Sequence, residues 1–395
     1  MRGSRGRRVS LVENGVYDVG AILLKSGVEF HLGRNAKLRG SRNPHDYAIA
    51  LPVTRGPYCA KATNKWSNAI LRILDAHDVS VTGEPGSEID GRNCLDPTGE
   101  EKFRGPHAIS VFHSTNLLFC GYCVRNAANY GLYVRGSARV KVERVDIEGG
   151  HDGFDFFNCE DVEVSGCFIR SGDDCVAGYG NRRLRVRHCS LNSSCSFFRI
   201  GGNDILVEEC HGEAPAVYPH RWSLSPEERS LERVPDGAGR HTTLAFFTFY
   251  TGKAAKGRGS SGIVFRNCRI AGVEQFIHYN LSGNERWQNG PGLADVTFEN
   301  VRATGMKRPL CVYAPSEMPV DVTFRNCELS FSEPVGELIR GANPGRFSVE
   351  GLSVERVNGP FLRSWNGSPD ISHRELNGID PVVVRGEGAF TEPAI

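Results

Sequence analysis

The sequence predicts an all-β protein whose chain winds into stacked coils, a parallel β-helix, and three observations carry this prediction. The first is an internal repeat, because residues 131–152, 153–174 and 175–196 align as three segments of 22 residues without a gap. The second is the alternation of apolar residues inside each segment, which is typical of strands. The third is the composition, in which 46 Gly, 20 Pro and only 3 Met favour short strands joined by turns.

Two positions of the repeat, two residues apart, are apolar in every segment. They are occupied by Val140, Val162 and Leu184 at the first and by Val142, Val164 and Val186 at the second. Because alternate side chains of a strand lie on one face, each segment is expected to point both residues into a shared core. One coil cannot bury this face alone, so the coils should stack with their strands in register, about 4.8 Å apart.

The repeat extends over nearly the whole chain. The apolar columns continue one coil upstream and one coil downstream, at Leu117, Phe119, Ile205 and Val207. Similar strand and turn patterns recur at 21–41, 73–91, 262–270, 295–303 and 321–329. We therefore expect residues 1–395 to form a single β-helix domain with coils of about 22 residues.

Residues 213–261 interrupt the repeat with aromatic, basic, Pro and Gly residues, so we expect an inserted loop there that flanks a cleft. Aromatic and imidazole side chains in and after this segment are candidate platforms for a ligand ring, with simple packing as the alternative. The candidates are Trp222, Phe247, Tyr250, His278, Tyr279 and Trp287.

The charge and the apolar content exclude two classes of partner. A formal net charge of +1 leaves no broad basic surface for nucleic acid. No stretch approaches the roughly 18 consecutive apolar residues of a membrane helix. Residues 1–15 are basic but lead into no apolar segment, so no signal peptide is expected in the chain as given. The protein would be cytoplasmic as given, or secreted or periplasmic if its start has been trimmed.

The cysteines are expected to be packed thiols. Thirteen is an odd number, which fits reduced thiols better than a complete disulfide framework. Cys167, Cys189 and Cys210 recur at or near the repeat spacing, which favours an interior stack over metal ligation. No metal and no other cofactor is expected.

The N-terminal end of the stack is expected to be uncapped, because the chain enters the repeat almost at once. Residues 1–19 would fold over the open edge, or a second subunit would cover it, or the natural chain begins further upstream. An oligomer formed through this end is therefore one expectation.

Three acidic residues and a histidine fall at one turn of the repeat. Asp152 and Asp174 are 22 residues apart, so they should stack on consecutive coils, and Asp173 precedes Asp174. His151 occupies the position of Asp173 one coil earlier. Like charges this close raise the pKa of at least one carboxyl group, and a hydrolase can use that group as its proton donor. The alternative is a solvated, Asp-rich turn.

The motifs around these acids resemble those of the polygalacturonase family, glycoside hydrolase family 28. In that family Asn-Thr-Asp is followed, 21 residues after its Asp, by Gly-Asp-Asp, and here GHDGFD and SGDDC place Asp152 and Asp173 at the same separation. The resemblance runs from about residue 10 to about residue 330, through LLKSGVEFHLGRNAKLRGS, EIDG and GLADVTFENV. It implies a right-handed, pectin-lyase-like β-helix with a carbohydrate substrate, whose sugar rings the aromatic candidates above would contact. A cleft closed by the insertion would then favour an exo-acting enzyme or one that acts on short substrates.

The family mechanism, carried over to these positions, implies that Asp173 is the general acid. Asp152 and Asp174 would hold and deprotonate the attacking water, the anomeric configuration would invert, and no metal would take part. The expected stacking is consistent with these roles, since two stacked carboxylates can share one water while the adjacent one points elsewhere.

The supporting imidazole of the family is missing. The Gly-His-Gly turn reads CSFFRIGG at 195–202, with Ser196 in the place of the His. We therefore expect another imidazole near the acids, from His151 or His241.

The cations that bind the substrate carboxylate in polygalacturonases are missing too, because FIHYN at 276–280 replaces the Arg-Ile-Lys segment. A neutral sugar or a differently placed acid is then expected in place of the standard substrate. Arg199 is the alternative cation, which would either bind a substrate anion or hold Asp174 ionised.

Three classes of function follow. The leading one is an inverting glycoside hydrolase that acts on a plant or algal polysaccharide or its oligosaccharides, and that differs from a standard polygalacturonase. The second is a polysaccharide lyase or epimerase, which on this fold uses acidic clusters for calcium and a Lys, Arg or Tyr as base. The third is a non-catalytic carbohydrate-binding β-helix. Release of reducing ends, release of unsaturated products, and binding without cleavage distinguish them.

Overall fold

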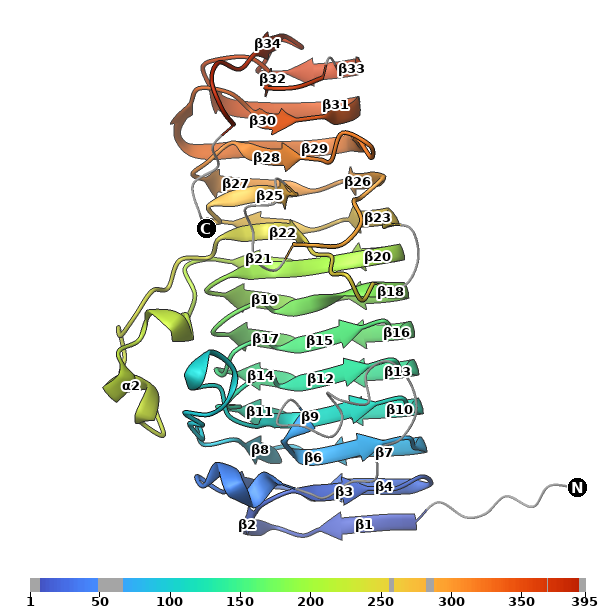
Figure 1. Cartoon of the computed structure of the whole chain (residues 1–395), viewed down its shortest axis with the longest axis vertical. Helices are drawn as coiled ribbons and strands as arrows, with labels where there is room; N and C mark the ends of the chain where they lie inside the picture. The colour runs from blue at the N-terminus through green and yellow to red at the C-terminus, as the bar shows by residue number, and fades with distance from the viewer. Residues whose placement is uncertain (1–7, 49–66, 256–258, 282–287, 368, 391–395) are drawn as a thin grey trace, which may run out of the picture. The chain divides into compact units, whose positions relative to one another are not determined.

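The computed structural model describes residues 8–48, 67–255, 259–281, 288–367 and 369–390. Nearly all regular structure in these residues is β-strand (Figure 1), which confirms the predicted fold class. The chain divides into two compact units, Met1–Asp173 with Tyr218–Arg240, and Asp174–Val217 with His241–Ile395. The expectation of a single domain over residues 1–395 stays a prediction.

The first unit is built of three-stranded coils, and each strand pairs in parallel with its counterpart in the next coil. Sheet I holds β1 (Arg8–Val12), β4 (Val28–Leu32), β7 (His77–Gly83), β10 (Thr115–Cys120), β13 (Ala138–Glu143) and β16 (Glu160–Ser165). Sheet II holds β2 (Gly15–Val19), β5 (Ala36–Gly40), β8 (Glu88–Asp90), β11 (Cys123–Arg125), β14 (Asp146–Glu148) and β17 (Phe168–Ser171). Sheet III holds β3 (Ile22–Leu24), β6 (Ala69–Leu74), β9 (His107–Phe112), β12 (Leu132–Arg135) and β15 (Phe154–Phe157).

The second unit repeats this arrangement, and some of its strands run through two sheets. One series is β18 (Val176–Arg187), β20 (Ser196–Glu208), β22 (Ala245–Phe249), β25 (Gln275–Asn280), β28 (Leu310–Tyr313), β30 (Ile339–Ala342), β32 (Leu362–Ser364) and β34 (Val383–Arg385). From β20 a second series continues through β23 (Ser261–Arg266), β26 (Asp295–Glu299), β29 (Val320–Val335), β31 (Pro344–Val357) and β33 (Ile371–Asn377). The third is β19 (Ser190–Ser193), β21 (His211–Glu213), β24 (Arg269–Ala271) and β27 (Arg302–Met306), which pairs with β29.

The register confirms the apolar columns within each unit. In the first unit Leu117 lies beside Val140, and Val140 beside Val162. In the second unit Leu184 lies beside Ile205, and Val186 beside Val207. These side chains are buried, so the alternation in the sequence marks the interior of the coils, as predicted. The cysteines of the described residues are free thiols and most are buried, as expected of packing residues.

Four short helices lie in the described residues: η1 (Pro44–Tyr47), η3 (Glu100–Lys102), η4 (Arg221–Ser223) and α2 (Pro226–Ser230). None of the described helices has the length and hydropathy needed to cross a membrane.

The segment predicted as one inserted loop at 213–261 contains a core strand. Strand β22 (AFFTF) is buried at all five positions and pairs with β20 and β25, so the apolar run joins a coil. The part at Tyr218–Arg240 belongs to the first unit, and the parts before and after it belong to the second. We call Tyr218–Arg240 the strap; it carries η4 and α2. Residues 256–258 lie outside the described residues.

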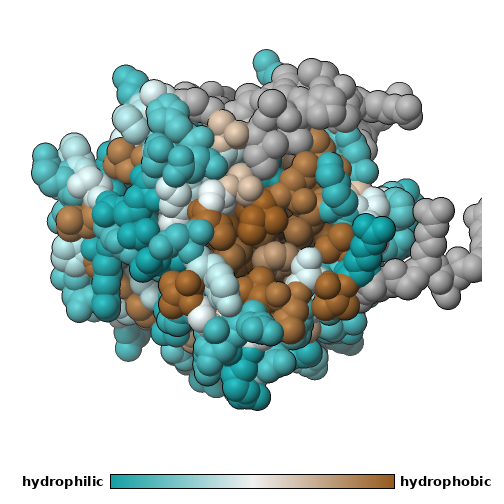
Figure 2. Space-filling model, turned by 90° about the horizontal axis from the view of Figure 1, so that it is seen from below, coloured by the Kyte–Doolittle hydropathy of each residue, from teal (hydrophilic) through white to brown (hydrophobic). Residues whose placement is uncertain are grey.

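Apolar side chains gather on the end of the first unit that its first coil forms (Figure 2). In the described residues β1 pairs with β4 alone and β2 with β5 alone, and Val9, Leu11 and Val16 are exposed. Association through this end stays a prediction.

Candidate active site

Asp173 lies in the turn that follows β17 in the first unit, and its side chain is 12% exposed. Its backbone N–H donates to the carbonyl of His151 (3.2 Å), which ties this turn to the turn of the preceding coil. Glycine at 172 is required here, because a Cβ atom would meet the carbonyl oxygens of Gly150 at 2.4 Å and Pro219 at 2.8 Å. The turn of the coil and the strap can therefore approach each other closely.

Two nitrogen-bearing side chains contact the Asp173 carboxylate. Arg104 donates from Nη2 to Oδ2 at 3.3 Å, and Nε2 of His220 lies 3.7 Å from Oδ1. Arg104 is itself buried and also pairs with Glu101, at 2.6 Å between Nε and Oε2. The low dielectric constant around these buried groups strengthens the attraction between the arginine, the imidazole and the carboxylate, and this attraction favours the ionised form of Asp173.

The pKa of Asp173 reflects two opposing effects. Burial raises the pKa. The contact with the His220 imidazole and the positive charges of His220 and Arg104 lower it by more than burial raises it, so the pKa lies well below its usual value. The sequence predicted a raised pKa for one carboxyl of the cluster, from repulsion among the acids. For Asp173 the cations supplied by other parts of the first unit reverse that expectation.

His151 forms part of the same buried cluster and is 1% exposed. Burial and the nearby charges of Arg104 and Arg221 hold the pKa of its imidazole well below the usual value, so the ring is neutral. The ring packs against Phe103 at 5.6 Å between centroids, and Nε2 has no hydrogen-bond partner among the described residues. The structure thus places His151 beside Asp173, as predicted, but as a neutral group.

His220, like Arg104, is a functional candidate that the sequence interpretation missed. It precedes η4 in the strap, 47 positions after Asp173, and no multiple of the repeat links the two residues. The only signal was its place in the segment YPHRW of the insertion, near aromatic and basic residues. His220 is thus an imidazole of the insertion that reaches Asp173 within the first unit.

The strap is fastened to the coils of the first unit by buried and half-buried contacts. Arg92 donates from Nε and Nη2 to both carboxylate oxygens of Glu232, at 2.7 and 3.0 Å. Arg221 donates to Oδ1 of Asn93 at 2.6 Å, and the Tyr218 hydroxyl donates to Glu148 at 2.8 Å. These contacts fix the residues on both sides of His220.

Trp222, one of the predicted sugar platforms, is a partly exposed aromatic beside this cluster. It is 52% exposed, its indole N–H donates to Glu101 at 2.9 Å, and its ring meets Phe103 edge-on at 5.6 Å. Its orientation is therefore fixed while much of its surface stays open to a ligand. A role in binding stays a prediction.

Asp152 lies in the turn before β15 and is 7% exposed. Its carbonyl accepts a hydrogen bond from the backbone of Gly131 at 2.9 Å. Its stacking on Asp174 stays a prediction.

Asp174 is held by the second unit. Its Oδ1 accepts from the backbone N–H of Ser196 at 2.9 Å, and Nη1 of Arg199 lies 3.9 Å from Oδ2. The Arg199 guanidinium also lies over the ring of Tyr250 at 4.6 Å. Ser196, which stands where the family has its His, thus uses its backbone to hold a carboxylate.

Three other predicted binding residues lie in the second unit. His241 bonds through Nδ1 to the carbonyl of Ala216 (2.9 Å), and His278 bonds through Nδ1 to Gln275 (3.0 Å) and is 3% exposed. Tyr279 is 1% exposed, packs on Phe249 and accepts from the Leu293 N–H, so it lies in the core and offers no face to a sugar. Trp287 lies outside the described residues.

Coils in parallel register, with carboxylates in the turns, define a right-handed parallel β-helix that is similar to glycoside hydrolase family 28. Residues 107–214 match the family model described as "Right handed beta helix region". A "Probable polygalacturonase" of Vitis vinifera is 25% identical over 185 residues, which cover 44% of this chain and 37% of that relative. The chain thus spans well under half the length of that relative.

Solved structures show the same fold over most of the chain. The "Family 28 Exopolygalacturonase" of Yersinia enterocolitica aligns with a TM-score of 0.58 and 16% identity, over 95% of this chain and 73% of its own. The "hyperthermoactive Exopolygalacturonase" of Thermotoga maritima aligns with a TM-score of 0.57 and 16% identity, over 92% and 84%.

Proposed function

We propose that this protein is a pectin-degrading glycoside hydrolase that inverts the anomeric configuration and uses Asp173 as its general acid. The observation that carries the proposal is the nearly buried Asp173 carboxylate, which sits on its predicted turn in contact with Arg104 and His220. The relative from Vitis vinifera, named as a probable polygalacturonase, supports a pectic substrate.

In the proposed reaction Asp173 gives its proton to the glycosidic oxygen as the bond from that oxygen to the anomeric carbon breaks. A water attacks the anomeric carbon from the opposite face and loses its proton to Asp152 or Asp174. The sugar leaves with a new hydroxyl, and the two carboxyl positions exchange one proton through solvent before the next turnover.

An ionised Asp173 cannot act as an acid, so binding of the substrate has to change its protonation. A uronate carboxylate that binds beside Arg104 and His220 adds a negative charge and competes for both cations. Each effect raises the pKa of Asp173. Arg104 and His220 would thus recognise the substrate carboxylate, which the Arg-Ile-Lys segment recognises in polygalacturonases. They favour an acidic sugar over a neutral one.

Arg199 favours the ionised form of Asp174 in this proposal. Its guanidinium lies too far from Asp174 for a hydrogen bond, but near enough to favour the ionised carboxylate that accepts a proton from water. The 4.6 Å contact with Tyr250 holds it in place.

The strap supports exo action. It brings His220 within 3.7 Å of Asp173, so a polymer has little room to continue past the acid on that side. An exo-acting enzyme would release monomers or dimers from the first minutes of digestion, whereas an endo-acting one would first lower the viscosity of the polymer.

The proposal is tested with the purified protein and its Asp173→Asn variant on pectic, rhamnogalacturonan, galactan and red-algal substrates, with and without chelator. We expect chelator-insensitive release of reducing ends from a pectic substrate, reduced at least about a hundredfold in the variant, since a positioned general acid contributes about 10²–10⁴-fold. Asp18→Asn, at an exposed carboxylate paired with Arg39, is the matched control and should leave the activity unchanged.

Each other outcome assigns a different function. Products that absorb in the ultraviolet, lost with chelator, would identify a lyase. Binding without cleavage, unchanged in Asp173→Asn, would identify a carbohydrate-binding β-helix.

A further inference from the structure

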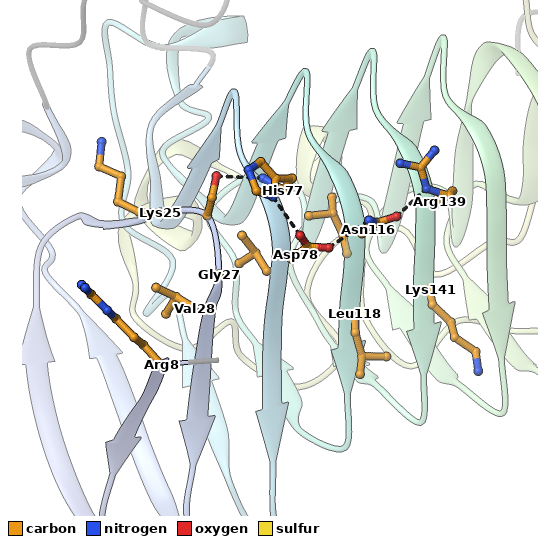
Figure 3. Close-up of a pocket in the computed structure, with 13 residues that line it drawn as sticks. Arg8, Lys25, Gly27, Val28, His77, Asp78, Asn116, Leu118, Arg139 and Lys141 are labelled. Atoms are coloured by element: carbon orange, nitrogen blue, oxygen red, sulfur yellow. Dashed lines mark hydrogen bonds and ion pairs between the residues drawn. The ribbon is translucent and has the colours of Figure 1, made fainter. Parts of the chain in front are cut away.

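A groove on sheet I of the first unit has no part in the proposed hydrolysis. It has a volume of about 890 Å³ and is lined by the beginnings of β1, β4, β7, β10 and β13 (Figure 3). Asp152 lies before a strand of sheet III, and Asp173 follows a strand of sheet II. The groove therefore belongs to a different face of the coils.

Cationic side chains dominate this groove. Arg8, Lys25, Arg139 and Lys141 line it, and among the described lining residues Asp78 alone carries a carboxylate. Neither Arg8 nor Lys25 forms an ion pair with the part of the chain that the structure describes, and Lys141 shares its charge with Glu143 at 2.8 Å. Since the whole chain has a net charge of only +1, the excess of positive charge is local.

A ladder of polar side chains across three coils orders the middle of the groove. Asp78, Asn116 and Arg139 take the same left-handed backbone conformation, with φ of 57°, 56° and 54°. Arg139 donates to Asn116, Asn116 donates to Asp78 at 2.9 Å, and His77 bonds Asp78 at 2.8 Å (Figure 3). Because the ladder already holds the Arg139 guanidinium in place, this side chain loses less conformational entropy when a ligand binds.

We propose that this groove binds a short stretch of an anionic polysaccharide through the carboxylates of its sugars. The strand spacing sets the geometry, because neighbouring strands about 4.8 Å apart offer one attachment point per coil, comparable to the length of one sugar unit. Arg139 supplies a planar donor pair for a carboxylate, and Lys25, Lys141 and Arg8 supply further charges. The ligand class follows from the charge of the groove and does not depend on the proposed hydrolysis.

The groove also limits the length of its ligand. The next strand of sheet I, β16, places Glu163 beside Lys141 and begins with Glu160. These acids repel a polyanion, so the bound stretch is confined to the four strand spacings between β1 and β13, about 19 Å. An oligosaccharide of a few uronate units is therefore the matching ligand.

The test measures binding, in the Asp173→Asn background so that the probe stays intact. Titration calorimetry with oligogalacturonates of defined length compares this protein with the additional double change Arg139→Asn and Lys141→Thr. Asn tolerates the left-handed conformation at 139, and Thr suits the exposed strand position at 141. The control double change, Arg302→Thr and Arg325→Thr, removes the same charge from exposed arginines of the second unit.

We expect the groove variant to lose one binding site, or to bind there at least about tenfold more weakly, while the control keeps it. The site should weaken as the ionic strength rises to about 0.15 M, and neutral galactan should not bind. Equal binding by the groove variant and the control would overturn the proposal. Tighter binding of single-stranded nucleic acid than of oligogalacturonate at this groove would overturn its ligand class. A failure of hydrolysis leaves these measurements unaffected.

Discussion

At the scale of single residues, the unusual feature is that the proposed acid is surrounded by cations. The sequence spacing predicted the turn on which Asp173 lies, because a repeat of 22 residues places it one coil after His151. It did not predict Arg104 or His220. Both lie far from Asp173 in sequence, and their side chains reach it only because the coils and the strap fold back on one another. The sign of a pKa shift depends on such contacts and not on the spacing of the acids alone.

His220 gives a prediction about pH dependence. A general acid works while it is protonated, so activity is lost on the alkaline side as the pH passes through its pKa. His220 lowers the pKa of Asp173, so His220→Gln raises that pKa and moves the alkaline limb of kcat, which reports the enzyme with substrate bound, to higher pH. The pH profile of the variant, recorded on whichever substrate of the panel the protein cleaves, checks this shift.

The matched control is His188→Gln, at an exposed imidazole paired with Glu209 in the second unit. Its pH profile should follow that of the unchanged protein. If His220→Gln lowered the rate equally at every pH, His220 would have a structural role alone.

At the scale of elements, the strap supplies His220, one of the two side chains that contact the Asp173 carboxylate. The sequence showed that the repeat is interrupted, but the predicted insertion was too long, because it included strand β22. A short buried run such as AFFTF is hard to distinguish by pattern from the apolar residues of a loop. Arg229 of α2 lies over Phe103 at 4.3 Å and donates to the carbonyls of Arg221 and Trp222. It therefore joins the strap to the turn that carries Arg104.

We predict that Arg229→Leu loosens the strap without unfolding the coils. The change removes the cation–π contact and two hydrogen bonds next to His220, so kcat/KM should fall about tenfold. Limited proteolysis should begin within Tyr218–Arg240, while the melting temperature shifts by no more than a few degrees. Unchanged protease resistance together with lost activity would show that Arg229 acts on the substrate and not on the strap.

At the scale of the whole molecule, the fold was the most predictable part. Columns such as Leu117, Val140 and Val162 recur because each coil has to bury its apolar residues on the next, and the parallel register follows from that need. The site was less predictable, because the repeat predicts the turn of Asp173 but gives no information about Arg104 and His220, which lie outside the aligned segments at 131–196. Tyr279 was a candidate platform for a sugar, but it lies within a regular strand, and its side chain is buried in the core.

The most direct test of the central claim is the anomeric configuration of the first product, followed by proton NMR during digestion of a pectic oligosaccharide. We predict that the new reducing end appears first as the anomer opposite to that of the cleaved bond and only later equilibrates, as expected when a water attacks from the face opposite the acid. A product that first retains the configuration, or one that carries a new double bond, would contradict the roles assigned to Asp152, Asp173 and Asp174.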